Sequence, residues 1–286
     1  MITIVQGALG ILTLAFSCVF YLNFKKNKTR LSTTGWPGLL AIGFITNFFD
    51  TLGIGNFAPQ TALFKLFRLV EDKLIPGTLN VGNTIPVVLE AFIFISVINV
   101  EPVTLLSMLV AAPIGAVMGA GIVAKLAVKK IQVGLGMALL VVAFTMFLGL
   151  VKLFPSGGYS VGLRGVKLII AIVVCFMLGS LHTIGIGFYA PCMALVYSLG
   201  MSPKVAFPIM MGCAATLMPA ASMKFIRANA QDTKASLALT LFGILGVLLA
   251  AYLITSLPLT ALKCVVIIAM LYTSFAMFKS AYQKRS

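Results

Sequence analysis

Two stretches of the chain repeat one pattern, Thr51-Leu52-Gly53-Ile54-Gly55-Asn56-Phe57-Ala58-Pro59 and Thr183-Ile184-Gly185-Ile186-Gly187-Phe188-Tyr189-Ala190-Pro191. They interrupt two apolar runs, 36–69 and 165–199, near the middle of each run. Either run is too long for one simple membrane span, which needs about 20 residues. Pro lacks a backbone N–H, and Gly adopts backbone angles that a helix does not use. Each run is therefore predicted to form two short helices joined by a break, which either cross the membrane once or turn back as a re-entrant hairpin.

The composition is typical of an all-α polytopic membrane protein. Of the 286 residues, 60% are hydrophobic and only 9% are charged. A soluble domain carries about a quarter charged residues, so the composition excludes a soluble globular protein and a disordered one. Besides the two broken runs, seven apolar runs are long enough to cross a membrane: 2–24, 76–99, 102–127, 131–154, 203–225, 233–256 and 258–279.

The basic residues predict how these spans are oriented. Lys25, Lys26, Lys28 and Arg30 follow the first span, which predicts a retained helix with its amino terminus outside. If both broken runs turn back, 16 of the 21 Lys and Arg residues collect on the side of the carboxyl terminus and 5 on the other. If both runs cross, the split is 13 to 8. Because basic residues gather on the cytoplasmic side, the charges favour hairpins and a cytoplasmic carboxyl terminus.

The repeated pattern extends into an internal duplication. Pro76, Gly82 and Pro86 parallel Pro203, Gly212 and Pro219 after the first and second break. Each half is then one broken hairpin followed by three spanning helices, 36–154 and 164–280, and residues 1–30 add an extra helix with a basic loop. With one hairpin on each side, the halves form inverted-topology repeats, which are common in secondary transporters. The alternative is an old duplication that is retained for helix packing.

The two breaks favour an anion-binding site. A break exposes backbone N–H groups at the start of the next half-helix, and these N–H groups and the helix dipole attract an anion. Gly53, Gly55, Gly185 and Gly187 would let an anion approach the main chain, although Gly can also serve tight packing alone. The side chains expected to add hydrogen-bond donors are Thr51, Asn56, Thr183 and Tyr189.

A second polar cluster follows each break. Asn83 and Thr84 lie within the run 76–99, and Cys213 and Thr216 lie in the matching part of 203–225. Polar side chains in a span need partners, so these four residues are candidates for contact with the substrate. Hydrogen bonding between helices is the alternative.

Three ionisable residues are candidates for proton coupling or for a gate. Asp50 and His182, the only histidine, directly precede the matched breaks and so hold equivalent positions. Charge at membrane depth is costly and usually functional, and histidine titrates near neutral pH. Glu90, within an apolar stretch, is a weaker candidate of the same kind. The alternative places Asp50 and His182 in polar loops at the mouths of the hairpins.

Motifs for catalysis are absent from the sequence. It has no His-Glu-x-x-His, Gly-x-Ser-x-Gly or Walker-type Gly-Lys-Ser/Thr motif, and one His with five scattered Cys does not predict a metal site. We therefore expect no enzyme activity, no metal and no cofactor. The net charge of +15 is expected at the ends of the spans, next to anionic lipid, and predicts no nucleic-acid partner.

The repeated Gly-rich break followed by Ala-Pro resembles the sulfite exporter family of the TauE/SafE type. The resemblance covers about 36–280 and rests on two homologous halves that each open with such a motif. It implies movement of sulfite, an organosulfonate or another small anion across the cytoplasmic membrane.

The expected function is thus that of a secondary transporter, an exporter or permease in the cell membrane, that binds a small anion at the paired breaks near the midplane. The expected partners are the anion and the lipid bilayer, with protons or a counter-ion as possible coupling ions. A homo-oligomer is also possible. An anion channel and a non-transporting membrane scaffold are the alternatives.

Overall fold

The computed structural model describes residues 2–28, 31–123, 125–153, 158–185 and 187–253, and short pieces between 267 and 282. The described part is helical and contains no strand beyond one isolated bridge between Ser160 and Met201. The helices are α1 Ile2–Asn27, α2 Trp36–Thr51, α3 Phe57–Leu66, α4 Ile75–Val97, α5 Pro102–Val123, α6 Val128–Leu150, α7 Gly165–His182, α8 Tyr189–Ser198, α9 Pro203–Arg227 and α10 Thr233–Leu253.

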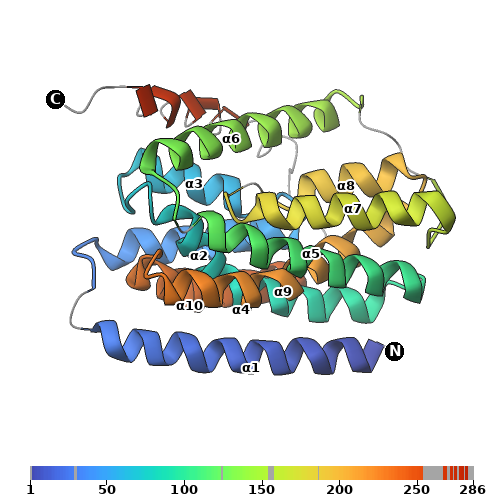
Figure 1. Ribbon diagram of the computed structural model, residues 1–286, viewed down its shortest axis with the longest axis horizontal. Coiled ribbons are helices and arrows are strands. Elements are labelled where there is room, and N and C mark those ends of the chain that lie inside the picture. Colours follow the sequence, from blue (N-terminus) through green and yellow to red (C-terminus); the bar gives the residue numbers. More distant parts are fainter. Residues whose placement is uncertain are drawn as a thin grey trace.

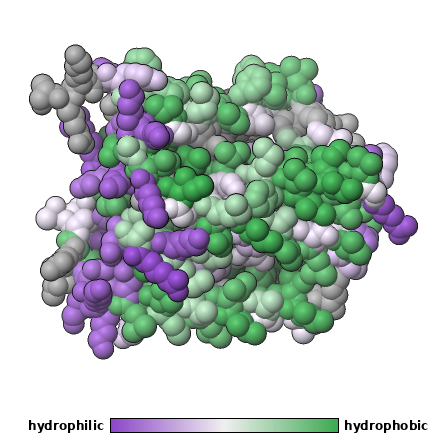
Figure 2. All heavy atoms as spheres, in the orientation of Figure 1, coloured by the Kyte–Doolittle hydropathy of each residue, from purple (hydrophilic) through white to green (hydrophobic). Residues whose placement is uncertain are grey.

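Seven of these helices are long and apolar enough to cross a membrane, namely α1, α4, α5, α6, α7, α9 and α10. The prediction of an all-α polytopic membrane protein is therefore confirmed. Hydrophilic side chains gather at one end of the molecule, and a broad apolar band covers its middle (Figure 2). The expected span 258–279 lies largely outside the described residues.

The first broken run turns back on itself. The hydroxyl of Thr34, just before α2, donates to the carbonyl of Leu69, just after α3, at 3.0 Å. Segments 31–34 and 64–74 also line one large cavity at the hydrophilic end of the molecule. Because the start of α2 and the end of α3 lie at the same end, α2 and α3 form a hairpin (Figure 1).

The second broken run also turns back, but at the opposite end of the molecule. The ammonium group of Lys167 in α7 donates to the carbonyl of Leu199, just after α8, at 3.1 Å. Glu101 follows α4, so it lies one helix length away from the start of α4 and from the hydrophilic end. Its N–H donates to the carbonyl of Val161, in the loop before α7, at 2.8 Å, which places this loop at the same end as Glu101. The α7–α8 hairpin thus enters from the right in Figure 1 and the α2–α3 hairpin from the left.

Two glycines end the first helix of each hairpin for a clear stereochemical reason. Gly53 and Gly185 have φ values of +84° and +102°, in the left-handed region that residues with a Cβ avoid. The N–H of Gly53 donates to Asp50 O at 2.7 Å, and the N–H of Ile54 donates to Phe49 O at 3.2 Å. This is a Schellman ending, which satisfies the last carbonyls of α2 and sends the chain in a new direction. Gly185 N–H donates to His182 O at 3.0 Å in the same way.

The helices pack so that each hairpin rests on a helix from the other half of the chain. In α2, Gly43 lies against α10, while α7 packs on α5 through Gly179 and Gly115. The helices α4 and α9 pack on each other between these pairs, and α1 lies along their outer side (Figure 1). Small residues let helix backbones approach closely in a membrane, where the hydrophobic effect drives no association.

Polar contacts around Glu101 join α5 to the loop before α7 at the end opposite the large cavity. Its carboxylate caps α5 by accepting from the N–H of Thr104 at 2.8 Å and from the Thr104 hydroxyl at 2.6 Å. These hydrogen bonds lower the pKa of Glu101 because they favour its charged form. The same Thr104 oxygen accepts from the N–H of Leu163 at 2.8 Å, which holds the loop before α7 onto α5.

Candidate functional site

The two breaks meet at one small internal cavity. Its lining residues are Asp50, Gly55, Asn56, Phe57, Val87, His182, Gly187, Phe188, Tyr189, Ala214 and Met218. The cavity has a volume of about 10 Å³, roughly the space that a single water molecule needs. It is the point at which the ends of α2 and α7 and the beginnings of α3 and α8 come together.

The cavity is lined by equivalent residues of the two breaks. Asp50 pairs with His182, Gly55 with Gly187, Asn56 with Phe188, and Phe57 with Tyr189, each 132 positions apart. Six residues that the sequence singled out thus lie together: Asp50, Gly55, Asn56, His182, Gly187 and Tyr189. Segments far apart in the sequence share this cavity because the hairpins enter from opposite ends and end at the same depth.

The glycines of the breaks serve two purposes. A Cβ placed on Gly55 or Gly187 would meet no atom within 4 Å, so both positions face open space at the cavity. A Cβ on Gly53 would lie 3.2 Å from the ring of Phe207, and one on Gly185 would lie 2.4 Å from Leu135. Gly53 and Gly185 end helices and do not line the cavity.

A network of amide side chains fills the inside of the first hairpin. Gln60 and Asn83 exchange hydrogen bonds, with Gln60 Nε2 donating to Asn83 Oδ1 at 2.9 Å and Asn83 Nδ2 donating to Gln60 Oε1 at 2.6 Å. Asn47 donates to Asn83 Oδ1 at 3.0 Å and accepts from Asn56 at 2.9 Å. Gln60 also donates to the Thr46 hydroxyl at 2.7 Å. The network connects α2, α3 and α4 and reaches the cavity through Asn56.

The sequence analysis missed Asn47, Gln60 and Thr46. A signal was present, because Asn47 lies one helical turn before Thr51 and Gln60 lies one turn after Asn56. Residues four apart share a face of a helix, so Asn47 is expected on the same face as Thr51, and Gln60 on the same face as Asn56. All three side chains are buried and fully engaged in hydrogen bonds.

Glu90 hydrogen-bonds to both breaks. The hydroxyl of Thr51 donates to Glu90 Oε1 at 2.8 Å, and the hydroxyl of Tyr189 donates to Oε2 at 2.7 Å. Glu90 lies on α4 and is completely buried. The carboxyl group of Asp50 is near enough to interact with it electrostatically, yet neither oxygen of Asp50 has a hydrogen-bond partner.

Other residues that the sequence singled out hydrogen-bond within or between helices and do not line the cavity. Thr84 bonds to Asn80 O at 2.7 Å and shares a hydrogen bond of 3.0 Å with Ser222 on α9. Thr216 donates to Leu109 O of α5 at 3.0 Å, and Thr183 donates to Ser180 O at 2.7 Å. For Thr84 and Thr216, hydrogen bonding between helices was the stated alternative to contact with the substrate, and both residues make such a hydrogen bond.

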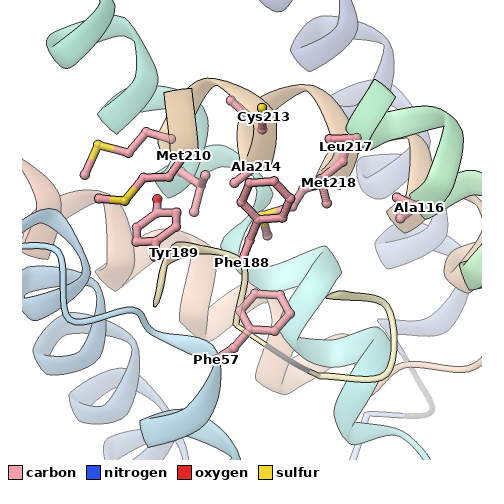
Figure 3. Close-up of a cluster of buried hydrophobic side chains, with 14 of the residues drawn as sticks. Phe57, Ala116, Phe188, Tyr189, Met210, Cys213, Ala214, Leu217 and Met218 are labelled. Atoms are coloured by element: carbon pink, nitrogen blue, oxygen red, sulfur yellow. The ribbon is translucent and has the colours of Figure 1, made fainter. Parts of the chain in front are cut away.

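Apart from Asp50, Asn56 and His182, the lining of the cavity is largely apolar and aromatic. Phe188 and Tyr189 lie beside Ala214 and Met218 of α9, and Phe57 comes from the first hairpin (Figure 3). The ring of His182 lies against Phe57, with centroids 4.1 Å apart, and near Phe188 at 6.2 Å. Cys213, one of three buried free thiols among the described residues, with Cys175 and Cys192, belongs to the same buried hydrophobic cluster (Figure 3).

A much larger cavity, of about 1290 Å³, opens at the hydrophilic end of the molecule. Its lining includes the ion pair of Lys65 and Asp72, with a nitrogen–oxygen distance of 2.5 Å, and Gln132 of α6, which donates to Asp72 at 2.7 Å. Phe64 lines this cavity, and Asn56 lines the small one. Gln60 lies between them on α3, about one helical turn from each.

Within the described residues, no three His, Cys, Asp or Glu side chains are placed to hold a metal ion. No family model, no curated protein and no solved structure matches the chain.

Proposed function

We propose that the protein is a secondary transporter that binds a small anion at the cavity between the two breaks. The observation that supports this most directly is that equivalent residues of the two hairpins line one small cavity. Non-helical backbone at membrane depth is tolerated mainly where it lines a cavity or a substrate path. A scaffold needs neither such breaks nor a polar centre.

The architecture supports the same proposal through its symmetry. We interpret the two halves, 36–154 and 164–280, as inverted-topology repeats. The contact of α2 with α10 has its equivalent in the contact of α7 with α5, and that of α4 with α10 has its equivalent in that of α9 with α5. In such folds one half rocks against the other, which exposes a fixed central site to each side in turn. The small cavity is then the occluded site.

The open cavity at the hydrophilic end supports access to the site from the cytoplasm. That end carries most of the basic residues, including Lys65, Arg68 and Lys279, and basic residues are enriched at the cytoplasmic surface. At the opposite end, hydrogen bonds join the start of α5 to Glu101 and to the loop before α7. This arrangement fits a carrier that faces inward, with its amino terminus outside and its carboxyl terminus inside.

The chemistry of the cavity favours an anion that has an apolar part. Gly55 and Gly187 let a ligand reach the backbone of the breaks, and the first residues of α3 and α8 have no side-chain cap. Phe57, Phe188 and Met218 would contact the apolar part of the ligand. Among the candidates that the resemblance suggests, an organosulfonate fits this mixed lining better than sulfite.

Flux measurements in proteoliposomes test the proposal. We expect saturable uptake of methanesulfonate or sulfoacetate, and faster uptake of labelled anion when the vesicles are preloaded with unlabelled anion. Sulfite, sulfate and chloride complete the panel. Uptake that rises linearly with concentration would indicate a channel, and no uptake of any of the five anions would indicate a scaffold. A thermal-shift screen of the same anions on purified protein reports binding independently, because a ligand stabilises the folded state by mass action.

A further inference from the structure

The buried acids raise a question that an anion site alone leaves open. Asp50 and Glu90 are the only acidic residues within the described helices, and both side chains are buried. Asp50 lines the cavity in which the anion would bind. Among the described residues, no Lys or Arg lines that cavity. Two adjacent carboxylates and an anion would place three negative charges together without a cation, which burial makes very costly.

The geometry around Glu90 shows how one charge is stabilised. Two hydroxyl groups, from Thr51 and Tyr189, each donate to a different oxygen of the Glu90 carboxyl group. This arrangement suits a carboxylate, because both of its oxygens accept hydrogen bonds. Asp50, by contrast, has two fully buried oxygens without any hydrogen-bond partner. A buried polar group without a partner is rare and points to a bound proton, ion or ligand.

The other titratable groups around the pair supply no fixed positive charge. Tyr189 and Cys192 come from α8, His182 comes from α7, and Cys213 comes from α9. The ring of His182 lies against Phe57, with ring centroids 4.1 Å apart, and near Phe188, at 6.2 Å. Of the described residues of α10, the only charged one is Lys234, in the first turn of the helix, where it contacts Ser32 and Trp36.

We propose that Asp50 and Glu90 share one proton in the empty site at neutral pH, held by Asp50, and that binding of an anion brings a second proton onto Glu90. The inference rests on the proposed function for its second part. The charge of the site is then −1 in both states, from one carboxylate when empty and from the anion when loaded. The transporter would therefore move one proton with each monovalent anion, with the acid pair and not His182 as the proton site.

Glu90 also gives this proton a mechanical role. Its carboxyl group is held by one residue of each break, so it ties the two hairpins together across the cavity. A protonated Glu90 accepts these hydroxyl hydrogen bonds more weakly, because a charged acceptor forms the stronger hydrogen bond. Full protonation of the pair would thus loosen the tie in the loaded state, the state in which the two halves must move.

Infrared spectroscopy of purified protein tests the shared proton without any substrate. The C=O stretch of a protonated carboxyl group is separate from the bands of carboxylates. The other four acids, Glu71, Asp72, Glu101 and Asp232, lie in the loops between the described helices, away from the cavity. We expect the band at neutral pH in the wild type, in Glu71→Gln and in His182→Gln, and its loss in the double variant Asp50→Asn, Glu90→Gln. Absence of the band in the wild type, or its survival in the double variant, would overturn the proposal.

Methanesulfonate tests the coupling, because it stays ionised and brings no proton of its own at neutral pH. Its binding should increase the carboxyl band and take up about one proton per anion from a weakly buffered solution. Binding without proton uptake would overturn the coupling. If no anion binds or moves, the proposed function fails, whereas the band of the empty protein still decides whether the proton is shared. The variant Tyr189→Phe provides a check that keeps both acids, since loss of its hydroxyl should shift the band.

Discussion

At the scale of single residues, the four glycines of the repeated motif differ in what they do. Gly53 and Gly185 end a helix with a positive φ, whereas Gly55 and Gly187 face the cavity. Sequence alone makes these four positions look equivalent, since each is a Gly in the same motif. Only the direction in which each missing Cβ would point separates helix termination from ligand access.

The cleanest substitution at the site is Gly187→Ala. An added methyl group at Gly187 would meet no protein atom within 4 Å. We therefore expect normal folding but weaker anion binding, because the methyl group would occupy the cavity. The loss of one backbone contact to the anion corresponds to about 1–3 kcal/mol, or roughly five- to hundredfold in affinity. The measurement is a titration of purified protein with methanesulfonate.

Two further variants are compared with Gly187→Ala. Gly149→Ala on α6 also adds a methyl group that meets no atom within 4 Å, but far from the cavity, and should bind like the wild type. Gly55→Ala should weaken binding as well, with an added cost in stability, because its φ is +87°. Equal affinities for Gly187→Ala and Gly149→Ala would show that the anion binds elsewhere.

Asn83 is the residue on which the amide network depends. It hydrogen-bonds to Asn47, Gln60 and the carbonyl of Leu79. We expect Asn83→Leu to destabilise the protein by about 1–3 kcal/mol, because it leaves buried amide groups without partners. Asn80→Leu is the matched control, since Asn80 is equally buried but bonds only to Pro76 O and leaves its own oxygen unpaired. Thermal unfolding in detergent compares the two, and equal losses would contradict the central role of Asn83.

At the scale of elements, the hairpins are held by close contacts between helices at glycine. An added Cβ on Gly179 of α7 would lie 2.1 Å from the carbonyl oxygen of Ala112, and one on Gly246 of α10 would lie 2.3 Å from that of Phe44. These glycines hold α7 against α5 and α2 against α10. The sequence analysis assigned them no role, because a Gly inside an apolar run has no distinguishing pattern.

We expect Gly179→Ala and Gly246→Ala each to destabilise the protein by about 1–3 kcal/mol, because the packed backbones must separate to admit the methyl group. The same exchange at Gly149, where space is open, should change stability little. Unfolding midpoints measured in one detergent make the comparison. Stabilities of Gly179→Ala and Gly246→Ala that match the wild type would mean that the hairpins are held by other contacts.

At the scale of the whole molecule, the two hairpins place specific loops at specific ends. Residues 28, 73, 129 and 229 lie at the hydrophilic end and are exposed, while Tyr159 and Arg164 are exposed at the opposite end. In a variant without native cysteines, single cysteines at the first four positions should be shielded from an impermeant thiol reagent in intact cells. Cysteines at 159 and 164 should react with it. Labelling of position 73 or 129 from outside would contradict the proposed orientation.

The sequence by itself determined the class of the protein and the places where its helices break. Hydropathy and the low content of charge predicted an all-α membrane protein, because a bilayer leaves little choice for the backbone of an apolar span. The motif of Thr, Gly, Ile, Gly, Ala and Pro predicted both breaks, since Gly and Pro act on the backbone locally. The described helices end at Thr51 and His182 and resume at Phe57 and Tyr189.

Only the tertiary structure decided which residues of those breaks lie together and what each of them touches. It brought Glu90 to Asp50, gave Asn47 and Gln60 a place in one network, and assigned Thr84, Thr183 and Thr216 to contacts within or between helices. Local pattern cannot specify such contacts, because some of them join segments more than 100 positions apart and depend on how the helices rotate and cross. The physical reason is that backbone conformation is fixed by neighbours in sequence, whereas a buried polar site is fixed by the partners that packing supplies.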